Sequence, residues 1–398
     1  MKNKKFLPSA FVLYLTYFVH GIGCSVLGQA VIKESLAGQW GYSDLAAGIG
    51  AVTMVSASLG LGRLITLPFS GPLSDKLGRR PSTIIGIICY AIFFFGIAFS
   101  PNMTVAYIAA IFGGAANSFL DTGVIPACVE ILEPRSSLAT MGTKFFISVA
   151  QLLLPFMLGF IAANNMSYNT ILIVTGIAIL VVGVLTLFAP LPKSEKTTDG
   201  EKQPGLIANI KSSKFTIESI ALIIIGFTCT ATFQLWLNCA QTFAKDLAGM
   251  ADPSIMQTYY SSGSLLAIVV TAVLVNKIKG VRFLLVYPAV TLVTLIAVLM
   301  FPSEGLCLIG AALVGYSAGA VILQLVTATC NDLFPKIKGT ITSIVMIMSS
   351  LSNYTILTLA GTMDSSSIMM MNIVITAIGV LLALFVNLRY SRLVGSNN

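Results

Sequence analysis

Charged side chains are scarce in this sequence. Only 10% of its 398 residues are Asp, Glu, Lys or Arg, whereas 56% are apolar. A soluble globular chain carries about 25% charged residues, so an ordinary soluble enzyme, a disordered chain and a fibrous repeat are excluded. A membrane-spanning helix needs about 20 mainly apolar residues. The composition therefore indicates an all-α membrane protein with room for a dozen spans.

The residue types of common metal and catalytic sites are also sparse. There is one histidine, His20, and the seven cysteines form no Cys-x-x-Cys pair. Neither a zinc site nor a disulfide framework is expected from such a pattern. The phosphate-binding motif of ATP-driven pumps is absent as well. We predict no enzyme activity and no cofactor, and we expect any transport to be driven by a gradient.

Twelve apolar windows of helical length follow one another along the chain. They cover residues 7–33, 44–70, 81–100, 103–129, 138–163, 169–190, 215–243, 254–275, 283–301, 305–329, 340–361 and 367–388. The long polar segment 191–214 separates six windows from six. We therefore predict a six-helix bundle at 1–190, a cytoplasmic linker at 191–214 and a second six-helix bundle at 215–398.

The net charge of +8 comes from short basic clusters between these windows. A nucleic-acid partner would require a continuous basic face, so none is expected. With a cytoplasmic N-terminus, the cytoplasmic segments hold 20 of the 23 basic residues, Lys144 included, and leave out Lys33, Arg63 and Lys245. Because Lys and Arg concentrate in cytoplasmic loops, both termini are predicted to be cytoplasmic. We expect a monomer whose surroundings are the lipid bilayer of a bacterial cytoplasmic membrane.

The two halves match each other at a constant offset of 201 residues. The matches fall at three equivalent loop positions: Asp75 with Asn276, Pro101 with Pro302, and Leu132 with Leu333. Agreement at one offset indicates a duplicated six-helix unit. Parallel repeats of this kind, related by an axis along the membrane normal, build transporters with a site between the halves.

The loop after the second window reads Gly-Pro-Leu-Ser-Asp-Lys-Leu-Gly-Arg-Arg. In it, Gly71 and Gly78 permit close helix approach and a tight turn. Asp75 can accept bonds from Arg79, from Arg80 and from a helix N-terminus, which would close the cytoplasmic face. The segment resembles the GxLxDxxGRR signature of the major facilitator superfamily. That resemblance implies twelve helices in two pseudo-symmetric bundles and transport by alternating access.

The loop after the fourth window supports the same resemblance. It contains Glu130 and Arg135 in a Glu-x-x-x-Pro-Arg segment that is similar to one in many facilitators. We expect these residues to join Arg79 and Arg80 in state-dependent contacts at the cytoplasmic gate. The Gly-Pro motif typical of drug/proton antiporters is missing from the fifth window, which weighs against multidrug efflux.

Several further segments resemble one bacterial group within that superfamily. They are His20-Gly21-Ile22, Gly60-Leu61-Gly62-Arg63-Leu64, Asn117-Ser118-x-Leu120-Asp121-Thr122-Gly123 and Tyr259-Tyr260-Ser261-x-Gly263-Ser264-Leu265. They look like the YdiM/YdiN-type inner-membrane transport proteins. The resemblance covers most of the chain and implies transport at the inner membrane, but supplies no substrate.

Charged groups inside membrane spans are costly, and by default they indicate function. His20, Arg63 and Asp121 lie inside the first, second and fourth windows. Gly71 is taken as the cytoplasmic end of its helix. At 1.5 Å per residue, Arg63 then lies about 12 Å outward from Gly71, and Asp121 lies about 13 Å outward from Glu130. The matching depths predict an Arg63–Asp121 pair, with Asn117 one turn from Asp121. A purely structural pair and a coupling or anion-binding pair are both open.

The second half offers only uncharged candidates. By analogy with the superfamily, whose first, fourth, seventh and tenth spans line the cavity, we select Gln234, Trp236, Asn238 and Gln324. We predict a secondary transporter for a small polar, anionic organic solute, with protons as the coupling ion and Asp121 and His20 as the titratable groups. Arg63 either attracts the solute or controls Asp121. Efflux of amphipathic compounds and a non-transporting solute sensor are the alternatives.

Overall fold

The computed structural model describes residues 4–133, 137–192, 215–275, 277–319, 321–334 and 337–396. Within these ranges, twelve segments are long and apolar enough to cross a membrane, which confirms the predicted number. The chain is thus an all-α, multi-pass membrane protein. Arg135 and residues 193–214 of the predicted linker lie outside the described residues.

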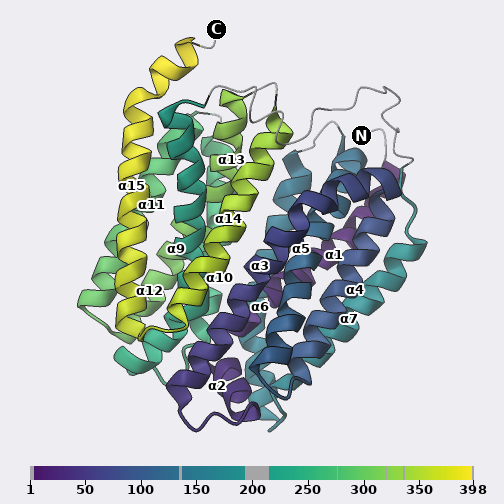
Figure 1. Ribbon diagram of the computed structural model, residues 1–398, viewed down its shortest axis with the longest axis vertical. Coiled ribbons are helices and arrows are strands. Elements are labelled where there is room, and N and C mark those ends of the chain that lie inside the picture. The colour runs from purple at the N-terminus through teal and green to yellow at the C-terminus, as the bar shows by residue number, and fades with distance from the viewer. Residues whose placement is uncertain are drawn as a thin grey trace.

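Residues 4–188 form the first bundle (Figure 1). Its elements are η1 (Lys4–Phe6), α1 (Leu7–Gly23), η2 (Val26–Gly28), α2 (Ala30–Gln39), α3 (Leu45–Leu77), α4 (Arg79–Ala98), α5 (Met103–Leu132), α6 (Ser137–Ala163) and α7 (Asn169–Phe188). The outward face of α7 exposes apolar side chains such as Val174, Val181 and Phe188. Such a face suits hydrocarbon and not water, in agreement with a lipid-facing helix.

Residues 217–396 form the second bundle beside the first (Figure 1). Its elements are α9 (Ile217–Leu247), α10 (Ile255–Leu274), α11 (Gly280–Met300), α12 (Glu304–Val314), η3 (Gly315–Gly319), α13 (Ile322–Leu333), α14 (Lys338–Ala360) and α15 (Ser365–Ser396). The start of α1 and the end of α15 lie at the same end of the molecule, here called the terminal end. The opposite end carries α2 and is called the α2 end.

The first window is not one continuous helix as its apolar run predicted. α1 ends at Gly23, and the chain passes through η2 before α2 begins at Ala30. Contact with the other bundle explains the break, because a Cβ on Gly28 would lie 2.3 Å from the carbonyl oxygen of Leu237 on α9. Only glycine allows the backbones of the two bundles to meet this closely.

The tenth span is broken in its middle. Between α12 and α13 the chain makes the π-helical turn η3, where a Cβ on Gly315 would lie 1.9 Å from the carbonyl oxygen of Tyr260. The turn reads Gly-Tyr-Ser-Ala-Gly, the pattern of a hydrolase nucleophile elbow. Ser317 is nevertheless buried, and its hydroxyl is bonded to Thr291 Oγ1 at 2.6 Å and to Leu313 O at 2.6 Å. It is therefore a packing serine of a helix break and not an exposed nucleophile.

Close contact between α3 and α5 sets the positions of the charged residues beside it. A Cβ on Gly62 would lie 1.9 Å from Ile111 O, and one on Gly114 would lie 2.0 Å from Leu59 O. Glycines at such contacts bring two helix axes together in a membrane. Arg63, next to Gly62, is thereby held within reach of the polar face of α5.

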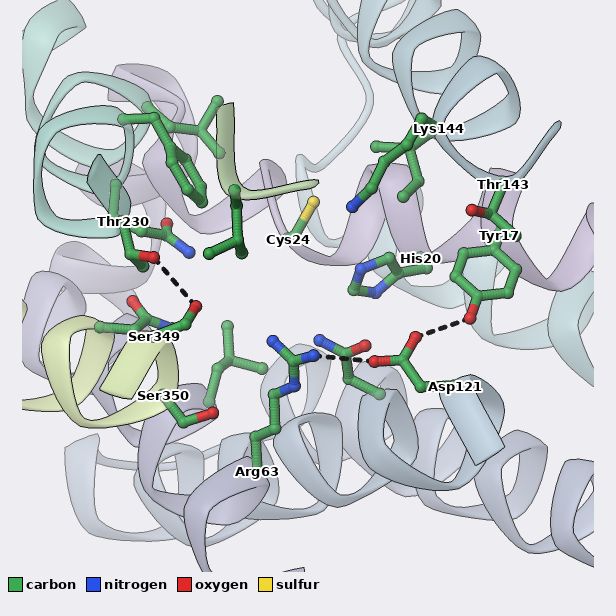
Figure 2. Close-up of a pocket in the computed structure, with 18 of the residues that line it drawn as sticks. Tyr17, His20, Cys24, Arg63, Asp121, Thr143, Lys144, Thr230, Ser349 and Ser350 are labelled. Atoms are coloured by element: carbon green, nitrogen blue, oxygen red, sulfur yellow. Dashed lines mark hydrogen bonds and ion pairs between the residues drawn. The ribbon is translucent and has the colours of Figure 1, made fainter. Parts of the chain in front are cut away.

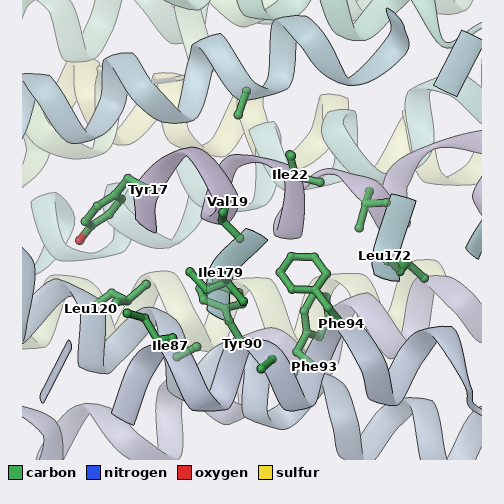
Figure 3. Packing of buried hydrophobic residues seen from close by; sticks show 14 of the residues in the cluster. Tyr17, Val19, Ile22, Ile87, Tyr90, Phe93, Phe94, Leu120, Leu172 and Ile179 are labelled. Atoms are coloured by element: carbon green, nitrogen blue, oxygen red, sulfur yellow. The ribbon is translucent and has the colours of Figure 1, made fainter. Parts of the chain in front are cut away.

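An aromatic cluster on α4 fills the core of the first bundle (Figure 3). Phe93 and Phe94 are fully buried, with ring centroids 4.9 Å apart, and Tyr90 stacks on Phe94 at 5.7 Å. Val19 and Ile22 of α1 pack against this cluster. The cluster fixes α1 against α4, and it presents the hydroxyl of Tyr90 to the polar interior.

Candidate functional site

A polar cavity of about 400 Å³ lies between the two bundles. Its wall is formed by α1, α3, α4, α5 and α6 of the first bundle and by α9, α10, α13 and α14 of the second. Pockets for small molecules typically measure about 300–1,000 Å³. The cavity therefore has the size for a small organic molecule that touches both bundles at once.

Arg63 on α3 and Asp121 on α5 form an ion pair in the cavity wall (Figure 2), as their matching depths predicted. Arg63 Nη2 donates to Asp121 Oδ2 at 2.8 Å, and the two side chains are 16% and 25% exposed. Tyr17 Oη donates to Asp121 Oδ1 at 2.6 Å. Both carboxylate oxygens thus accept a hydrogen bond from a neighbouring side chain.

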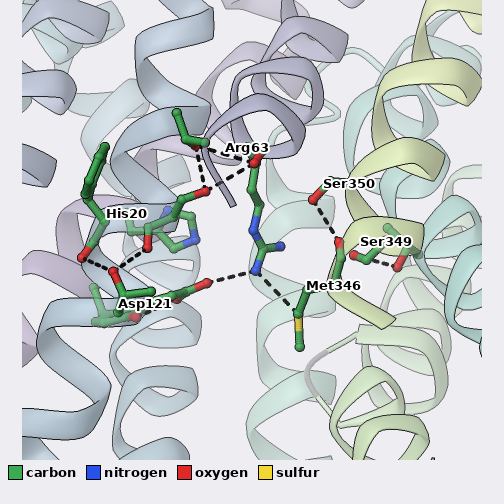
Figure 4. Close-up of polar contacts among 12 residues, drawn as sticks. His20, Arg63, Asp121, Met346, Ser349 and Ser350 are labelled. Carbon is green, nitrogen blue, oxygen red and sulfur yellow. Dashed lines mark hydrogen bonds and ion pairs between the residues drawn. The ribbon is translucent and has the colours of Figure 1, made fainter. Parts of the chain in front are cut away.

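Arg63 also touches the second bundle (Figure 4). Its Nη2 donates to Met346 Sδ on α14 at 3.5 Å. A thioether is a weak acceptor, so this contact adds little energy. It nevertheless places the guanidinium at the boundary of the two bundles, where a movement of α14 changes its surroundings.

His20 on α1 is held by the aromatic core. Its Nδ1 forms a hydrogen bond with Tyr90 Oη, whose ring is buried. The donor in this bond depends on the imidazole tautomer. His20 therefore has a fixed orientation in the wall, near Lys144 in Figure 2.

Seven of the eight predicted substrate and coupling residues line this cavity: His20, Arg63, Asn117, Asp121, Gln234, Asn238 and Gln324. Trp236 does not line it. Its ring is 4% exposed in a hydrophobic cluster of the second bundle, 3.3 Å from the position of a Cβ on Gly310. Residues one turn apart share a helix face, so Gln234 and Asn238 face the cavity while Trp236, between them, points away.

The sequence interpretation missed a polar stripe on α6. Thr140, Lys144, Ser148 and Gln151 all line the cavity. They recur at intervals of four, four and three residues, which is the spacing of one helix face. Lys144 was interpreted only as a basic residue near the cytoplasmic end of its span, but the structure places it in the wall.

Charge is distributed unevenly around the cavity. The formally charged side chains among its described lining residues are Arg63, Asp121 and Lys144, all in the first bundle. The second bundle contributes hydroxyl and amide groups: Thr230, Gln234, Asn238, Tyr260, Ser264, Gln324, Thr327, Thr342, Ser349, Ser350 and Asn353. The cavity can therefore bind a charged group on one side and neutral polar groups on the other.

Among the described residues of the predicted cytoplasmic gate, Arg79 contacts both Asp75 and Glu130 at the terminal end, within the first bundle. Arg79 Nη1 donates to Asp75 Oδ1 at 2.8 Å, and Arg79 Nε lies 3.7 Å from Glu130 Oε1. The Asp75 side chain is 71% exposed. Exposed pairs are worth about 0–1 kcal/mol, so these contacts add little stability. Their predicted role in closing this end stays a prediction.

The two signature glycines have different outcomes. Gly78 has a φ of +102°, which L side chains rarely adopt, and forms the predicted tight turn between α3 and α4. A Cβ on Gly71 would meet no atom within 4 Å, so the predicted close helix approach there is wrong. Gly71 also does not end its helix, because α3 continues to Leu77. Arg80 Nη2 donates to Ala189 O at 2.5 Å, which ties α4 to the end of α7.

Glutamines join the bundles at the α2 end. Gln241 Nε2 on α9 donates to Gln29 Oε1 at 2.9 Å, and Ala30 N donates to Gln241 Oε1 at 3.0 Å. Gln29 Nε2 in turn donates to Gln257 Oε1 on α10 at 3.4 Å. These side chains are buried. The break between α1 and α2 thus has its polar groups satisfied by the opposite bundle.

Two lysines strengthen the same contact. Lys33 is only 1% exposed, and its Nζ donates to Thr53 Oγ1 at 2.8 Å and to Asn238 O at 2.5 Å. Lys245 on α9 forms an ion pair with Glu34 on α2. The Lys33 bond to Asn238 O and the Lys245–Glu34 ion pair both join the first bundle to α9 of the second. These contacts hold the two bundles together at the α2 end.

Two bundles of six spans with a polar cavity between them are the architecture of membrane transporters built from parallel repeats. The chain belongs to the Major Facilitator Superfamily, which it matches over residues 13–357. It is therefore a membrane transporter by family and fold.

Individual proteins agree with this assignment. The chain is 31% identical over 393 residues to the inner membrane transport protein YdiN of Escherichia coli, covering 97% of this chain and 91% of that protein. It is 33% identical over 402 residues to the uncharacterized MFS-type transporter YfkL of Bacillus subtilis, covering 98% of each. The crystal structure of a D-xylose-proton symporter has the same fold, with a TM-score of 0.75, 19% identity and coverage of 96% and 97%.

Proposed function

We propose that this protein is a secondary active transporter that moves a small anionic organic solute by alternating access, coupled to protons. The observation that carries the proposal is the cavity between the bundles, with all three of its described charged side chains on one wall and neutral polar groups on the other. The solute's anionic group would face the first bundle, and its polar body would face the second. Such a site touches both moving parts, as alternating access requires.

The arrangement of contacts supports an inward-facing conformation. The glutamine and lysine contacts close the α2 end, and the positive-inside distribution of Lys and Arg supports a cytoplasmic terminal end. The cavity would exchange its solute with the cytoplasm in this state. Separation of the bundles at Gly28 and Gln241 would then open the opposite side.

The Arg63–Asp121 pair provides a route for coupling. In the conformation described, Asp121 accepts bonds from Arg63 and Tyr17. Separation of Arg63 from Asp121 would leave the carboxylate without its cationic partner, and in this proposal it then takes up the coupling proton. Re-formation of the pair would release that proton on the cytoplasmic side. In this proposal Arg63 controls Asp121 and does not bind the solute.

Replacing Asp121 with asparagine is expected to abolish accumulation driven by a proton gradient while leaving exchange intact. The amide keeps one of the two acceptor oxygens that Tyr17 and Arg63 use, but it cannot take up or release the coupling proton. Exchange needs only reorientation of the loaded carrier, whereas accumulation needs a change of protonation. The substrate for this test is the carboxylate that, in a thermal-shift screen of the purified protein, most raises its melting temperature. Uptake and counterflow of this compound in proteoliposomes measure the two activities separately.

The matched control is Glu304→Gln, which removes an exposed acid in the first turn of α12. It should leave both activities unchanged. Equal loss of accumulation and exchange in Asp121→Asn would contradict the coupling role. Movement of amphipathic compounds in place of carboxylates would favour efflux, and binding without movement would favour a sensor.

A further inference from the structure

Lys144 is the cation of the cavity that no described acid neutralises. Asp121 is paired with Arg63 at 2.8 Å, and the salt bridges found among the described residues do not include Lys144. Because the charges of Arg63 and Asp121 cancel, the described lining of the cavity keeps one formal positive charge, that of Lys144. An uncompensated ammonium within a membrane span is costly unless water or a counter-charge meets it.

The position of Lys144 is set by two close contacts between α1 and α6. A Cβ on Gly142 would lie 2.6 Å from the ring of Tyr14, and one on Gly21 would lie 2.5 Å from Ile147 O. These contacts lie on either side of Lys144 along α6. Tyr14 Oη also donates to Ala139 O at 3.1 Å. Helix α6 is therefore packed tightly against α1 on both sides of Lys144.

The side chain of Lys144 points into the cavity. Figure 2 shows its ammonium extending towards the open centre near His20 and Cys24, while Arg63 extends from the opposite side. Lys144 lies seven residues beyond Ser137, the first residue of α6, which corresponds to about 10 Å along the helix. Its amine therefore faces the cavity between the bundles from within the span, whereas a snorkelling lysine would reach the membrane surface.

The groups around this amine are suited to an anion with a hydroxylated body. Thr140, Thr143 and Ser148 of α6 line the cavity beside it and offer hydroxyl groups. Across the cavity, Thr230, Ser349 and Ser350 present further hydroxyls (Figure 2). A dicarboxylate would leave its second charge against this uncharged wall. The arrangement favours one carboxylate and several hydroxyl groups.

We propose that Lys144 is the anchor of the substrate and that the substrate class is hydroxylated monocarboxylates. The ammonium binds the carboxylate as a charge-assisted donor, and the second bundle binds the hydroxyl groups. This inference rests on the proposed function and makes it more specific. It assigns solute binding to Lys144 and leaves Arg63 to the control of Asp121.

Three pairs of probes test the inference on the purified full-length protein: glycerate with glycerol, gluconate with sorbitol, and 4-hydroxybenzoate with 4-hydroxybenzyl alcohol. Each pair differs mainly in the carboxylate. We expect at least one carboxylate to bind the wild type by calorimetry and to raise its melting temperature, and its neutral partner to do neither. Glucarate, with two carboxylates on the gluconate skeleton, should bind more weakly than gluconate where gluconate is the binder.

Lys144→Met should weaken binding of that carboxylate about tenfold to a hundredfold, the range for loss of a hydrogen bond to a charged group. Lys144→Arg should restore most of the affinity. Lys277→Met removes a lysine that is exposed at the terminal end and should change nothing. In each variant, the melting temperature without ligand must stay close to that of the wild type. If Lys144→Met lowers it, Lys144→Gln is used in place of Lys144→Met.

The outcomes separate this inference from the proposed function. Unchanged affinity in Lys144→Met together with lost affinity in Arg63→Gln would overturn the anchor and leave an anion transporter. Tighter binding of the neutral partners, or binding of none of the carboxylates, would overturn the anchor and the anionic substrate together. Tighter binding of glucarate than of gluconate would overturn the restriction to monocarboxylates.

Discussion

Gly28→Val is expected to hold the α2 end open. A Cβ at position 28 would lie 2.3 Å from the carbonyl oxygen of Leu237, which is backbone of the opposite bundle. The clash cannot be relieved by a side-chain rotation, but it disappears when the bundles separate at this end. Overpacking of this kind costs about 1–3 kcal/mol. The ratio of closed to open molecules should therefore fall by about fivefold to 160-fold.

Cys239 is a native reporter for that opening. It is 6% exposed, in a cluster where Ala57 and Leu357 of the two bundles meet. In a variant that keeps Cys239 as its only cysteine, a membrane-impermeant maleimide added on the α2-end side should label Gly28→Val about tenfold faster than the parent. Labelling of this residue in membranes measures the effect without a substrate.

Gly38→Val provides the matched control, because a Cβ at Gly38 on α2 would meet no atom within 4 Å. It should leave the labelling rate unchanged. Gly50→Ala is an independent variant with the same kind of clash, since its Cβ would lie 2.3 Å from the carbonyl oxygen of Gly361, directly after α14. Equal labelling of the clashing and control variants would show that contact between the bundles at this end does not hold them closed.

Arg63→Gln and Asp121→Asn should each destabilise the protein, whereas the double variant should recover. Removal of one partner leaves the other charge uncompensated, which costs about 3–5 kcal/mol for a buried pair. The side chains remain 16% and 25% exposed on a cavity, so we expect a loss of about 3 kcal/mol, the lower end of that range. Thermal unfolding of the four proteins in the same detergent gives the comparison.

Binding and coupling distinguish the roles of this pair. The double variant has lost its titratable carboxyl group but keeps Lys144. It should be stable and should bind the carboxylate probe with wild-type affinity, but it should not accumulate it against a gradient. A stable double variant that no longer binds the probe would assign the solute's anionic group to Arg63. Full proton-driven accumulation would reduce the pair to a structural contact between helices.

The span count and the pair of charges were predictable from local properties of the sequence. Span number follows from apolar length, and the Arg63–Asp121 pair follows from two rare intramembrane charges at equal depth. The comparison of depths gave the right pair although it took Gly71 as the end of its helix. Helix α3 continues beyond Gly71 to Leu77, but the relative positions of the two residues were close enough to meet.

The breaks in the helices were not predictable, because contacts between distant segments cause them. Nothing in the apolar run of the first window requires a break after Gly23; the approach of Gly28 to Leu237 on the other bundle does. The same holds for Gly315 against Tyr260 in the tenth span. The sequence alone does not show whether a glycine in these windows faces lipid or contacts another helix. That distinction requires the position of the partner helix.

The wall of the cavity was partly predictable. The choice of spans by analogy selected α1, α5, α9 and the tenth span, which contains α13. It gave no criterion for the face of α9, and so it included Trp236 with Gln234 and Asn238. Lys144 was overlooked because its distance from the helix end suited a topological role. The spacing of Thr140, Lys144 and Ser148 shows that they share one face of α6. That this face lines the cavity is known only from the structure.

Solute-driven proton movement in proteoliposomes tests the central claim most directly. A pH-sensitive dye is enclosed with the wild-type protein, and a hydroxylated monocarboxylate that binds it is added outside. We predict acidification of the interior that empty liposomes, Asp121→Asn and the neutral alcohol partner do not show. Binding of the carboxylate with no acidification and no uptake would contradict the account.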